Sequence, residues 1–166
     1  CDPGRYKKSQ ALTNSSNFNC IDCPGGYVTS EIQQASCFPC IPGKYQGEKG
    51  ALYCLACKIG RASDKVANKN STCTACHRGT YQPREGRSTC LSCPLGRYNN
   101  KIGQETCFFC KKDQFADTPK SVECKLCEIG KYTLKVAQSS CLECGAGKYG
   151  VRGACIDCPT GFFRMD

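Results

Sequence analysis

The chain has 166 residues, of which 19 are cysteine, and it carries a formal net charge of +9. Leu, Ile, Val and Phe number only 27 and Trp is absent, so apolar burial alone is not expected to offset the conformational entropy lost on folding. This composition excludes an ordinary globular core and indicates a disulfide scaffold in an oxidising, extracellular compartment.

Along the chain, the main feature is a series of nine C-x-x-C pairs, and Cys1 stands outside them. Most pairs recur every 17 residues, one interval is 19 residues and the last is 14. This regularity predicts a tandem repeat with one short unit per interval. The pairs are Cys20/Cys23, Cys37/Cys40, Cys54/Cys57, Cys73/Cys76, Cys90/Cys93, Cys107/Cys110, Cys124/Cys127, Cys141/Cys144 and Cys155/Cys158.

Each unit begins in the same way after its opening cysteine, which is Cys1 or the second cysteine of a pair. A glycine stands three residues on in every unit except at Asp113, and an aromatic residue stands five residues on in most units. Tyr27 comes one residue early and Ala62 breaks the aromatic rule. The glycines predict a turn with positive φ or close backbone approach. They are Gly4, Gly26, Gly43, Gly60, Gly79, Gly96, Gly130, Gly147 and Gly161.

The residues beside these glycines predict short strands with two faces. Because side chains alternate along a strand, the aromatics should turn inward and the basic residue before each should turn outward. The first residue inside each C-x-x-C is usually apolar, so we expect it to form a small core with the aromatic. The outward basic residues are Arg5, Lys44, Arg61, Arg97, Lys131 and Lys148.

Three disulfide arrangements fit the spacing, because connectivity does not follow from spacing alone. Bonding within each C-x-x-C would give nine redox motifs, and crossing neighbouring pairs, as in Cys20–Cys37 with Cys23–Cys40, would give a 34-residue period. Sequential closure leaves only Cys158 unpaired, so the chain is expected to be a fragment of a longer protein. The sequential pairs are Cys1–Cys20, Cys23–Cys37, Cys40–Cys54, Cys57–Cys73, Cys76–Cys90, Cys93–Cys107, Cys110–Cys124, Cys127–Cys141 and Cys144–Cys155.

Metal and catalytic sites have little support in the sequence. The spacing C-x-x-C-x13-C-x-x-C resembles a four-cysteine zinc site, but the repeat shows no pairing of units and leaves Cys1 over. His77 is the one histidine, and the acidic residues follow no catalytic motif. We therefore expect no metal, no cofactor and no enzymatic activity.

Two further signals concern the surface and the compartment. Asn14 and Asn70 are acceptors in N-x-S/T sequons, and both lie in the loops that are longer than the standard unit. No apolar run is long enough to cross a bilayer, so we expect no membrane insertion by this segment. Nucleic acid is an unsuitable partner, because no recognition motif accompanies the positive charge.

The signature C-x-x-C-x-x-G-x-[YF]-x8-C-x-x-C resembles the ephrin-receptor-like cysteine-rich repeats, and this resemblance covers essentially the whole chain. The segment from Cys93 to Tyr98 is also similar to the opening loop of tumour necrosis factor receptor-type modules. In those modules the two end cysteines of the loop bond to each other, which favours the sequential pairing here. The resemblance implies a place in a large extracellular protein, such as a receptor, a matrix protein or a surface protein.

The expected fold is small, disulfide-rich and mostly irregular, with short β-hairpins and almost no helix. Residues 1–166 are expected to form one continuous array, an elongated rod of loops of about 17 residues in which each loop contacts mainly its neighbours.

The expected function is that of a structural rod or stalk in a secreted or cell-surface protein, with a filament or fibre as one form of this role and other protein chains as partners. A ligand-binding receptor ectodomain is the alternative, with Phe108 and Phe109 as its partner patch. The six basic residues are a candidate stripe for acidic polysaccharide.

Overall fold

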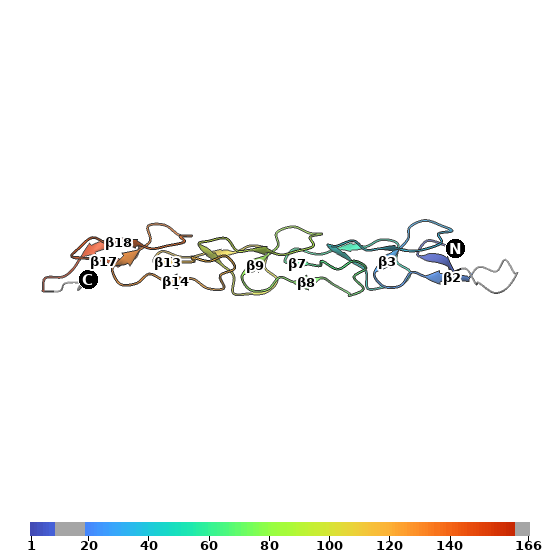
Figure 1. The fold of residues 1–166 in the computed structure, drawn as a ribbon, viewed down its shortest axis with the longest axis horizontal. Coiled ribbons are helices and arrows are strands. Elements are labelled where there is room, and N and C mark those ends of the chain that lie inside the picture. The colour runs from blue at the N-terminus through green and yellow to red at the C-terminus, as the bar shows by residue number, and fades with distance from the viewer. Residues whose placement is uncertain (9–18, 162–166) are drawn as a thin grey trace. The chain divides into compact units, whose positions relative to one another are not determined.

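The computed structural model describes residues 1–8 and 19–161, and this part of the chain contains no helix. It consists of nine two-stranded antiparallel hairpins joined by irregular loops (Figure 1). The strands are β1 (Arg5–Lys8), β2 (Asn19–Asp22), β3 (Tyr27–Val28), β4 (Phe38–Pro39), β5 (Lys44–Tyr45), β6 (Leu55–Ala56), β7 (Arg61–Ala62), β8 (Thr74–Ala75), β9 (Thr80–Tyr81), β10 (Leu91–Ser92), β11 (Arg97–Tyr98), β12 (Phe108–Phe109), β13 (Gln114–Phe115), β14 (Lys125–Leu126), β15 (Lys131–Tyr132), β16 (Leu142–Glu143), β17 (Lys148–Val151) and β18 (Ala154–Asp157).

Every hairpin pairs the same two positions of the repeat. Its first strand includes the two residues after the repeat glycine or after Asp113, and its second strand includes the two residues inside the next C-x-x-C. The strands β1, β2, β17 and β18 extend to four residues. In the hairpin β11–β12, Tyr98 lies opposite Phe108 and Arg97 lies opposite Phe109. The expected small, irregular, disulfide-rich fold with short hairpins is thus confirmed.

The disulfides of the structure follow the sequential arrangement. The cysteines at the two ends of a loop are joined, with Cα–Cα distances between 5.3 and 5.8 Å. Cys76 and Cys90 are also disulfide-bonded, so all described cysteines except Cys158 are bonded. Closing a loop of about 15 residues contributes roughly 3 kcal/mol in the entropic model. The other pairs seen are Cys40–Cys54, Cys57–Cys73, Cys93–Cys107, Cys110–Cys124, Cys127–Cys141 and Cys144–Cys155.

Backbone hydrogen bonds tie each loop to the next one. The amide of the repeat glycine donates to a carbonyl six residues after the next opening cysteine, as Gly96 does to Ala116 (2.9 Å). These bonds fix the register between consecutive loops, which have no hydrophobic core to do so. The same bond joins Gly4–Thr29 (2.8 Å), Gly26–Gln46 (2.6 Å), Gly43–Ser63 (2.7 Å), Gly60–Gln82 (2.8 Å) and Gly79–Asn99 (2.7 Å).

A second set of bonds ends at the carbonyls of the opening cysteines. Ala137, whose φ is 62°, donates its amide to the carbonyl of Cys110 in the preceding loop (2.8 Å). The donor has positive φ in every case, whether or not it is glycine. The equivalent bonds are Gln33–Cys1 (3.0 Å), Gly50–Cys23 (2.9 Å), Ala67–Cys40 (2.8 Å), Gly86–Cys57 (2.8 Å), Gly103–Cys76 (2.7 Å) and Lys120–Cys93 (3.0 Å).

The repeat glycines also touch the loop after the next one. A Cβ added to Gly96 would lie 2.0 Å from the carbonyl oxygen of Ala137, two loops further along. Loops therefore pack against their second neighbours as well as their first, which extends the nearest-neighbour contact expected from the sequence. A Cβ added to four other repeat glycines would lie similarly close to a carbonyl oxygen two loops along. These distances are 2.1 Å from Gly4 to Gly50, 2.2 Å from Gly26 to Ala67, 2.1 Å from Gly43 to Gly86 and 2.1 Å from Gly79 to Lys120.

The predicted core of aromatic and aliphatic side chains is wrong in its aliphatic half. The apolar residues at the first position inside the C-x-x-C pairs are 36–57% exposed, and the aromatics opposite them are half-buried. The buried side chains are mainly the cysteines, because strands of two to four residues leave the outer face of each hairpin uncovered. The exposed residues are Ile21, Phe38, Leu55, Leu91, Phe108, Leu142 and Ile156.

A polar side chain shares the interior with the sulfurs. In the units that open at Cys23 to Cys127, the residue six positions after the opening cysteine is buried and is usually polar, and Asn99 is completely enclosed. Its Nδ2 donates to the carbonyl of Thr80 (2.8 Å) and its Oδ1 accepts from the amide of Lys101 (3.1 Å). These bonds satisfy groups that would otherwise be costly to bury. The series is Thr29, Gln46, Ser63, Gln82, Asn99, Ala116 and Thr133.

The described chain divides into two compact units. Unit 1 comprises residues 1–75 and 82–90, and unit 2 comprises residues 76–81 and 91–166, so the division passes through the loop between Cys76 and Cys90. The same hydrogen bonds recur inside each unit. That both units form one continuous, rod-shaped array stays a prediction.

Candidate functional surface

The predicted partner patch lies on the hairpin β11–β12 of unit 2. Phe108 and Phe109 are 41% and 51% exposed. The Phe108 ring packs on Tyr98 with 5.9 Å between centroids, and the guanidinium carbon of Arg97 lies 4.1 Å from the centroid of Phe109. Each ring thus has a partner within its own hairpin, and binding of another protein here stays a prediction.

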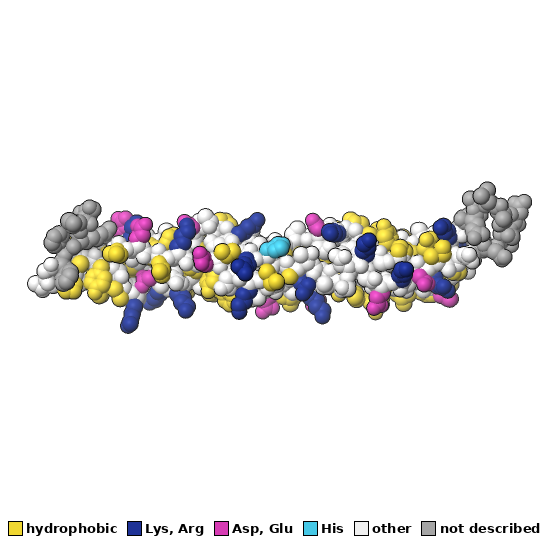
Figure 2. Space-filling view, turned by 90° about the horizontal axis from the view of Figure 1, so that it is seen from below, with side chains coloured by type: hydrophobic (Ala, Val, Ile, Leu, Met, Phe, Trp, Pro, Cys, Tyr) yellow, Lys and Arg dark blue, Asp and Glu magenta, His cyan; other side chains and the backbone are white. Residues whose placement is uncertain are grey.

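The six basic residues of the predicted polysaccharide stripe occupy equivalent positions in their hairpins, and most of them are engaged locally. Arg61 donates to the carbonyl of Cys73 (2.8 Å), and three others pair with acidic residues. On the face shown in Figure 2, basic side chains lie among acidic and hydrophobic ones. The attraction for polyanions is correspondingly reduced, and the stripe stays a prediction. The ion pairs are Arg5–Asp22 (2.7 Å), Lys131–Glu128 (3.1 Å), Lys131–Glu143 (3.9 Å) and Lys148–Asp157 (3.1 Å).

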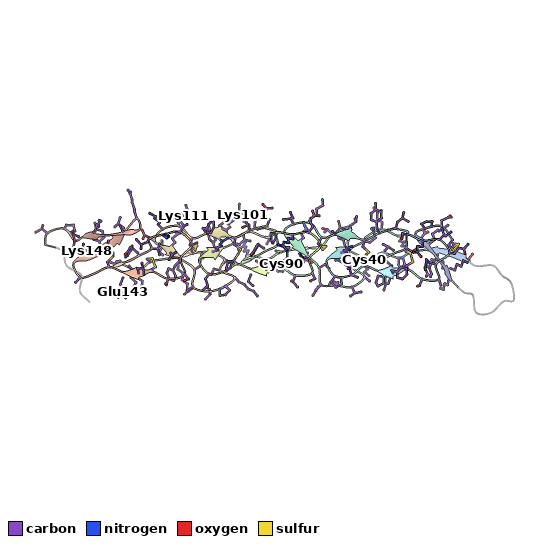
Figure 3. All side chains as sticks on the ribbon, turned by 90° about the horizontal axis from the view of Figure 1, so that it is seen from above. Cys40, Cys90, Lys101, Lys111, Glu143 and Lys148 are labelled. Carbon is purple, nitrogen blue, oxygen red and sulfur yellow. A yellow bond between two sulfur atoms is a disulfide. The ribbon has the colours of Figure 1, made fainter. Side chains whose placement is uncertain are left out.

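Other lysines of unit 2 extend from its surface. Lys101 and Lys111 point outward in Figure 3, whereas the disulfide sulfurs lie inside the ribbon. Lys101 is exposed, and the side chain of Lys112 packs against Gly153. Positive charge is therefore distributed over several hairpins of the unit.

One ion pair has a clear effect on acid–base behaviour. The Lys125 ammonium lies 2.8 and 3.0 Å from the two carboxylate oxygens of Asp117. The hydrogen bond from Lys125 lowers the pKa of the Asp117 carboxyl. Lys125 also lies 5.9 Å from the centroid of the Phe115 ring opposite it, so this hairpin carries a small charged and aromatic cluster.

An open groove in unit 1, with a volume of about 590 Å³, was not foreseen from the sequence. It lies along the loop between Cys40 and Cys54, and its walls include Tyr45, Tyr53 and Glu48. Lys69 and Ser71 from the following loop complete it. Tyr53 is 68% exposed there, and no motif in the sequence points to this groove.

The two predicted glycosylation acceptors differ in what the structure says of them. Asn70 is exposed, and its backbone amide donates to Oδ1 of Asn68 (3.1 Å). Asn14 lies outside the described residues. Glycosylation of either residue stays a prediction.

Cys158 is half-buried and free. Its amide donates to the carbonyl of Gly147 (2.8 Å), the bond that other opening cysteines make to the preceding repeat glycine. Its backbone thus has the geometry of an opening cysteine. Among residues 1–8 and 19–161, no group of three or more His, Cys, Asp or Glu side chains is arranged to hold a metal ion.

Comparison with known proteins agrees with the geometry. A family model described as tyrosine-protein kinase ephrin type A/B receptor-like matches residues 25–71, 65–107 and 117–154. Thyroglobulin of Rattus norvegicus is 36% identical over 63 residues, which are 38% of this chain and 2% of thyroglobulin. The chain therefore spans only a small fraction of the length of that relative.

Tandem disulfide loops with short hairpins, built on a repeated cysteine and glycine pattern, define an extracellular type of cysteine-rich repeat module. More than half of the chain matches the family model, and the chain belongs to the ephrin type A/B receptor-like family. The disulfides and the family point to an extracellular or secreted domain. A helix suited to crossing a lipid bilayer does not occur among the described residues.

Proposed function

We propose that the chain is a structural segment of a larger secreted or cell-surface protein, in which it carries tension or holds other parts apart. The observation that supports this most is the repetition of the same two backbone bonds from loop to loop in each unit. Such uniformity is typical of a scaffold, because a binding site usually depends on one unit that differs from the others.

The disulfides suit a segment under tension. The chain between two joined cysteines is bypassed by the disulfide, whose Cα–Cα distance is only 5.3–5.8 Å. A force applied at the two ends therefore acts through the disulfides and the C-x-x-C segments, and the loops stay closed. Partners in this role are other protein chains of a matrix, a surface layer or a filament.

Pulling on single molecules tests this proposal. Without reductant, we expect no lengthening from the opening of loops, because covalent bonds close them. With reductant, each broken disulfide should release roughly 50 Å of chain, since about 14 residues of up to 3.6 Å each become extensible. Loop-sized steps in the absence of reductant would contradict a role in bearing tension.

The receptor alternative is favoured by one observation, the exposure of Phe108 and Phe109. It is tested by chemical cross-linking on cells that secrete the protein, with the double variant Phe108→Ser and Phe109→Ser. A structural segment should keep the same cross-linked neighbours in this variant. Loss of one prominent soluble partner would favour the receptor.

A further inference from the structure

The glycosylation acceptor Asn70 lies in an insertion. The loop from Cys57 to Cys73 is two residues longer than the standard loop. The amide of Gln46 donates to the carbonyl of Asn68 (3.0 Å), just as the amide of Thr29 donates to the carbonyl of Ala51 (3.4 Å). Because Asn68 therefore occupies a standard position, the two extra residues fall between it and Cys73, in the exposed segment that contains the sequon.

This insertion lies against the preceding loop, beside the groove of unit 1. A Cβ added to Gly47 would lie 3.1 Å from the Cα of Ser71 and 3.4 Å from the carbonyl oxygen of Asn70. Lys69 and Ser71, the residues on either side of Asn70, both line the groove, and Asn70 itself does not. A glycan attached to Asn70 would therefore be tethered next to the groove, and its first sugars would have to turn toward it.

The groove has the chemistry that a pyranose ring needs. Tyr53 and Leu52 are 68% and 43% exposed, and they offer an aromatic face and an aliphatic edge to the C–H groups of a sugar. Glu48 and Lys69 add one carboxylate and one ammonium group for hydrogen bonds to hydroxyl or acetamido groups. The groove thus combines apolar and polar walls, as a sugar with hydroxyl groups and C–H faces requires.

The walls of the groove are held in place by the chain itself. Nε2 of the buried Gln46 donates to the carbonyl of Tyr53 (3.0 Å), and its Oε1 accepts from the amide of Glu48 (3.1 Å). The segment 48–53, which forms much of the groove, is therefore fixed at both ends to the side chain of Gln46. Because this backbone is already held in place, it loses little conformational entropy when a ligand binds in the groove.

We propose that the groove holds the first N-acetylglucosamine residues of a glycan on Asn70. The glycan is joined through Nδ2 of Asn70 to C1 of the sugar, with loss of an amide proton and departure of the lipid pyrophosphate of the oligosaccharide donor. Because the sugar is tethered beside the groove, its effective concentration is on the order of millimolar and a weak contact suffices. This inference adds to the proposed structural role and does not depend on it.

Nuclear magnetic resonance of the whole chain, secreted from a eukaryotic host, tests the contact. Intact mass and peptide mapping establish occupancy of Asn70, and trimming with an endoglycosidase leaves one sugar for assignment. We expect nuclear Overhauser effects between the acetyl methyl protons and the Tyr53 ring, with an upfield shift of the methyl signal. Both should vanish in Tyr53→Ser and persist in Phe38→Ser, which removes a 57% exposed aromatic of unit 1 outside the groove.

A thermal comparison provides a second readout. Removing the glycan with Asn70→Gln should lower the melting temperature by about 2–4 °C in the otherwise unchanged chain, and by much less in the Tyr53→Ser background. Equal shifts in both backgrounds would overturn the proposal. So would an unmodified Asn70 in a preparation whose Asn14 is modified, or sugars without contacts to Tyr53. Concentration-dependent shifts of Tyr53 in place of those contacts would assign the groove to a second copy of the chain.

Discussion

At the scale of single residues, the repeat glycine is the position where the backbone conformation and the approach of a later loop restrict the choice of residue most. Its fixed offset from the opening cysteine predicts a turn or a close approach, and both occur: Gly96 has φ 74° and its Cα faces the carbonyl of Ala137. The identity of that partner was beyond the sequence, because a 17-residue period does not reveal which loops meet in space. The buried polar residue six positions after the opening cysteine was also missed, since it varies among Thr, Gln, Ser and Asn.

Gly96→Ala tests the contact with the second loop along. Both Gly96 and Gly147 have φ 74°, but a Cβ on Gly147 would meet nothing within 4 Å. Gly147→Ala should therefore cost about 1 kcal/mol of backbone strain, and Gly96→Ala roughly 1–3 kcal/mol more. Denaturant unfolding measures the free energies, and hydrogen exchange of the Ala137 amide reports the local effect. Equal costs in the two variants would contradict the packing described here.

Two irregularities of the sequence explain each other in the structure. Asp113 replaces the repeat glycine, and the loop two units later, from Cys144 to Cys155, is three residues shorter than the standard loop. The Asp113 carboxylate accepts hydrogen bonds from the amides of Gly153 (2.9 Å) and Thr133 (3.2 Å). The aspartate thus makes contacts with later loops where other units rely on a bare glycine.

Asp113→Gly restores the repeat pattern but should destabilise unit 2. The amides of Gly153 and Thr133 lose their acceptor, which costs about 1–3 kcal/mol for each group left unsatisfied. This cost exceeds the backbone strain that a glycine relieves at this positive φ. Hydrogen exchange should accelerate at both amides in Asp113→Gly and at only one of them in Asp113→Asn, which keeps a single acceptor oxygen. Unchanged exchange in the glycine variant would show that the carboxylate has no such role.

At the scale of elements, the sequence predicted the hairpins but not their burial. Strand positions follow from the glycine and the C-x-x-C, so that Tyr98 lies opposite Phe108 and Ala62 lies opposite Thr74. Strands of two residues, however, form no sheet face that could cover the aliphatic partner. For this reason Leu55 and Leu142 are exposed, although their apolar nature suggested a core.

The hairpin β13–β14 gives a prediction about pH. Because Lys125 lowers the pKa of Asp117, their ion pair stabilises the folded hairpin above the ordinary pKa of an aspartate, and this contribution is lost as the pH falls through the folded-state pKa. Titration of the Asp117 side chain by nuclear magnetic resonance should show a midpoint below the usual range. In Lys125→Gln the midpoint should return to that range, and a midpoint that is the same in both proteins would exclude the ion pair in solution.

At the scale of the whole molecule, closed loops and repeated backbone bonds take the place of a hydrophobic interior. Composition alone indicated that covalent links were needed, and the resemblance to known repeats indicated which cysteines join. The grooved surface could not be predicted, because it arises where an insertion in one loop lies over the loop before it. Function is also less determined than fold, since scaffold and receptor use the same repeat.

Thermal unfolding with and without reductant tests the central claim, that disulfide-closed loops hold this fold together. The oxidised chain should give a dispersed amide spectrum and a cooperative melting transition. After complete reduction at neutral pH and 25 °C, the dispersion and the transition should both be lost, because the remaining apolar burial does not offset the chain entropy. A fully reduced chain that kept its dispersed spectrum and melted cooperatively would contradict the account.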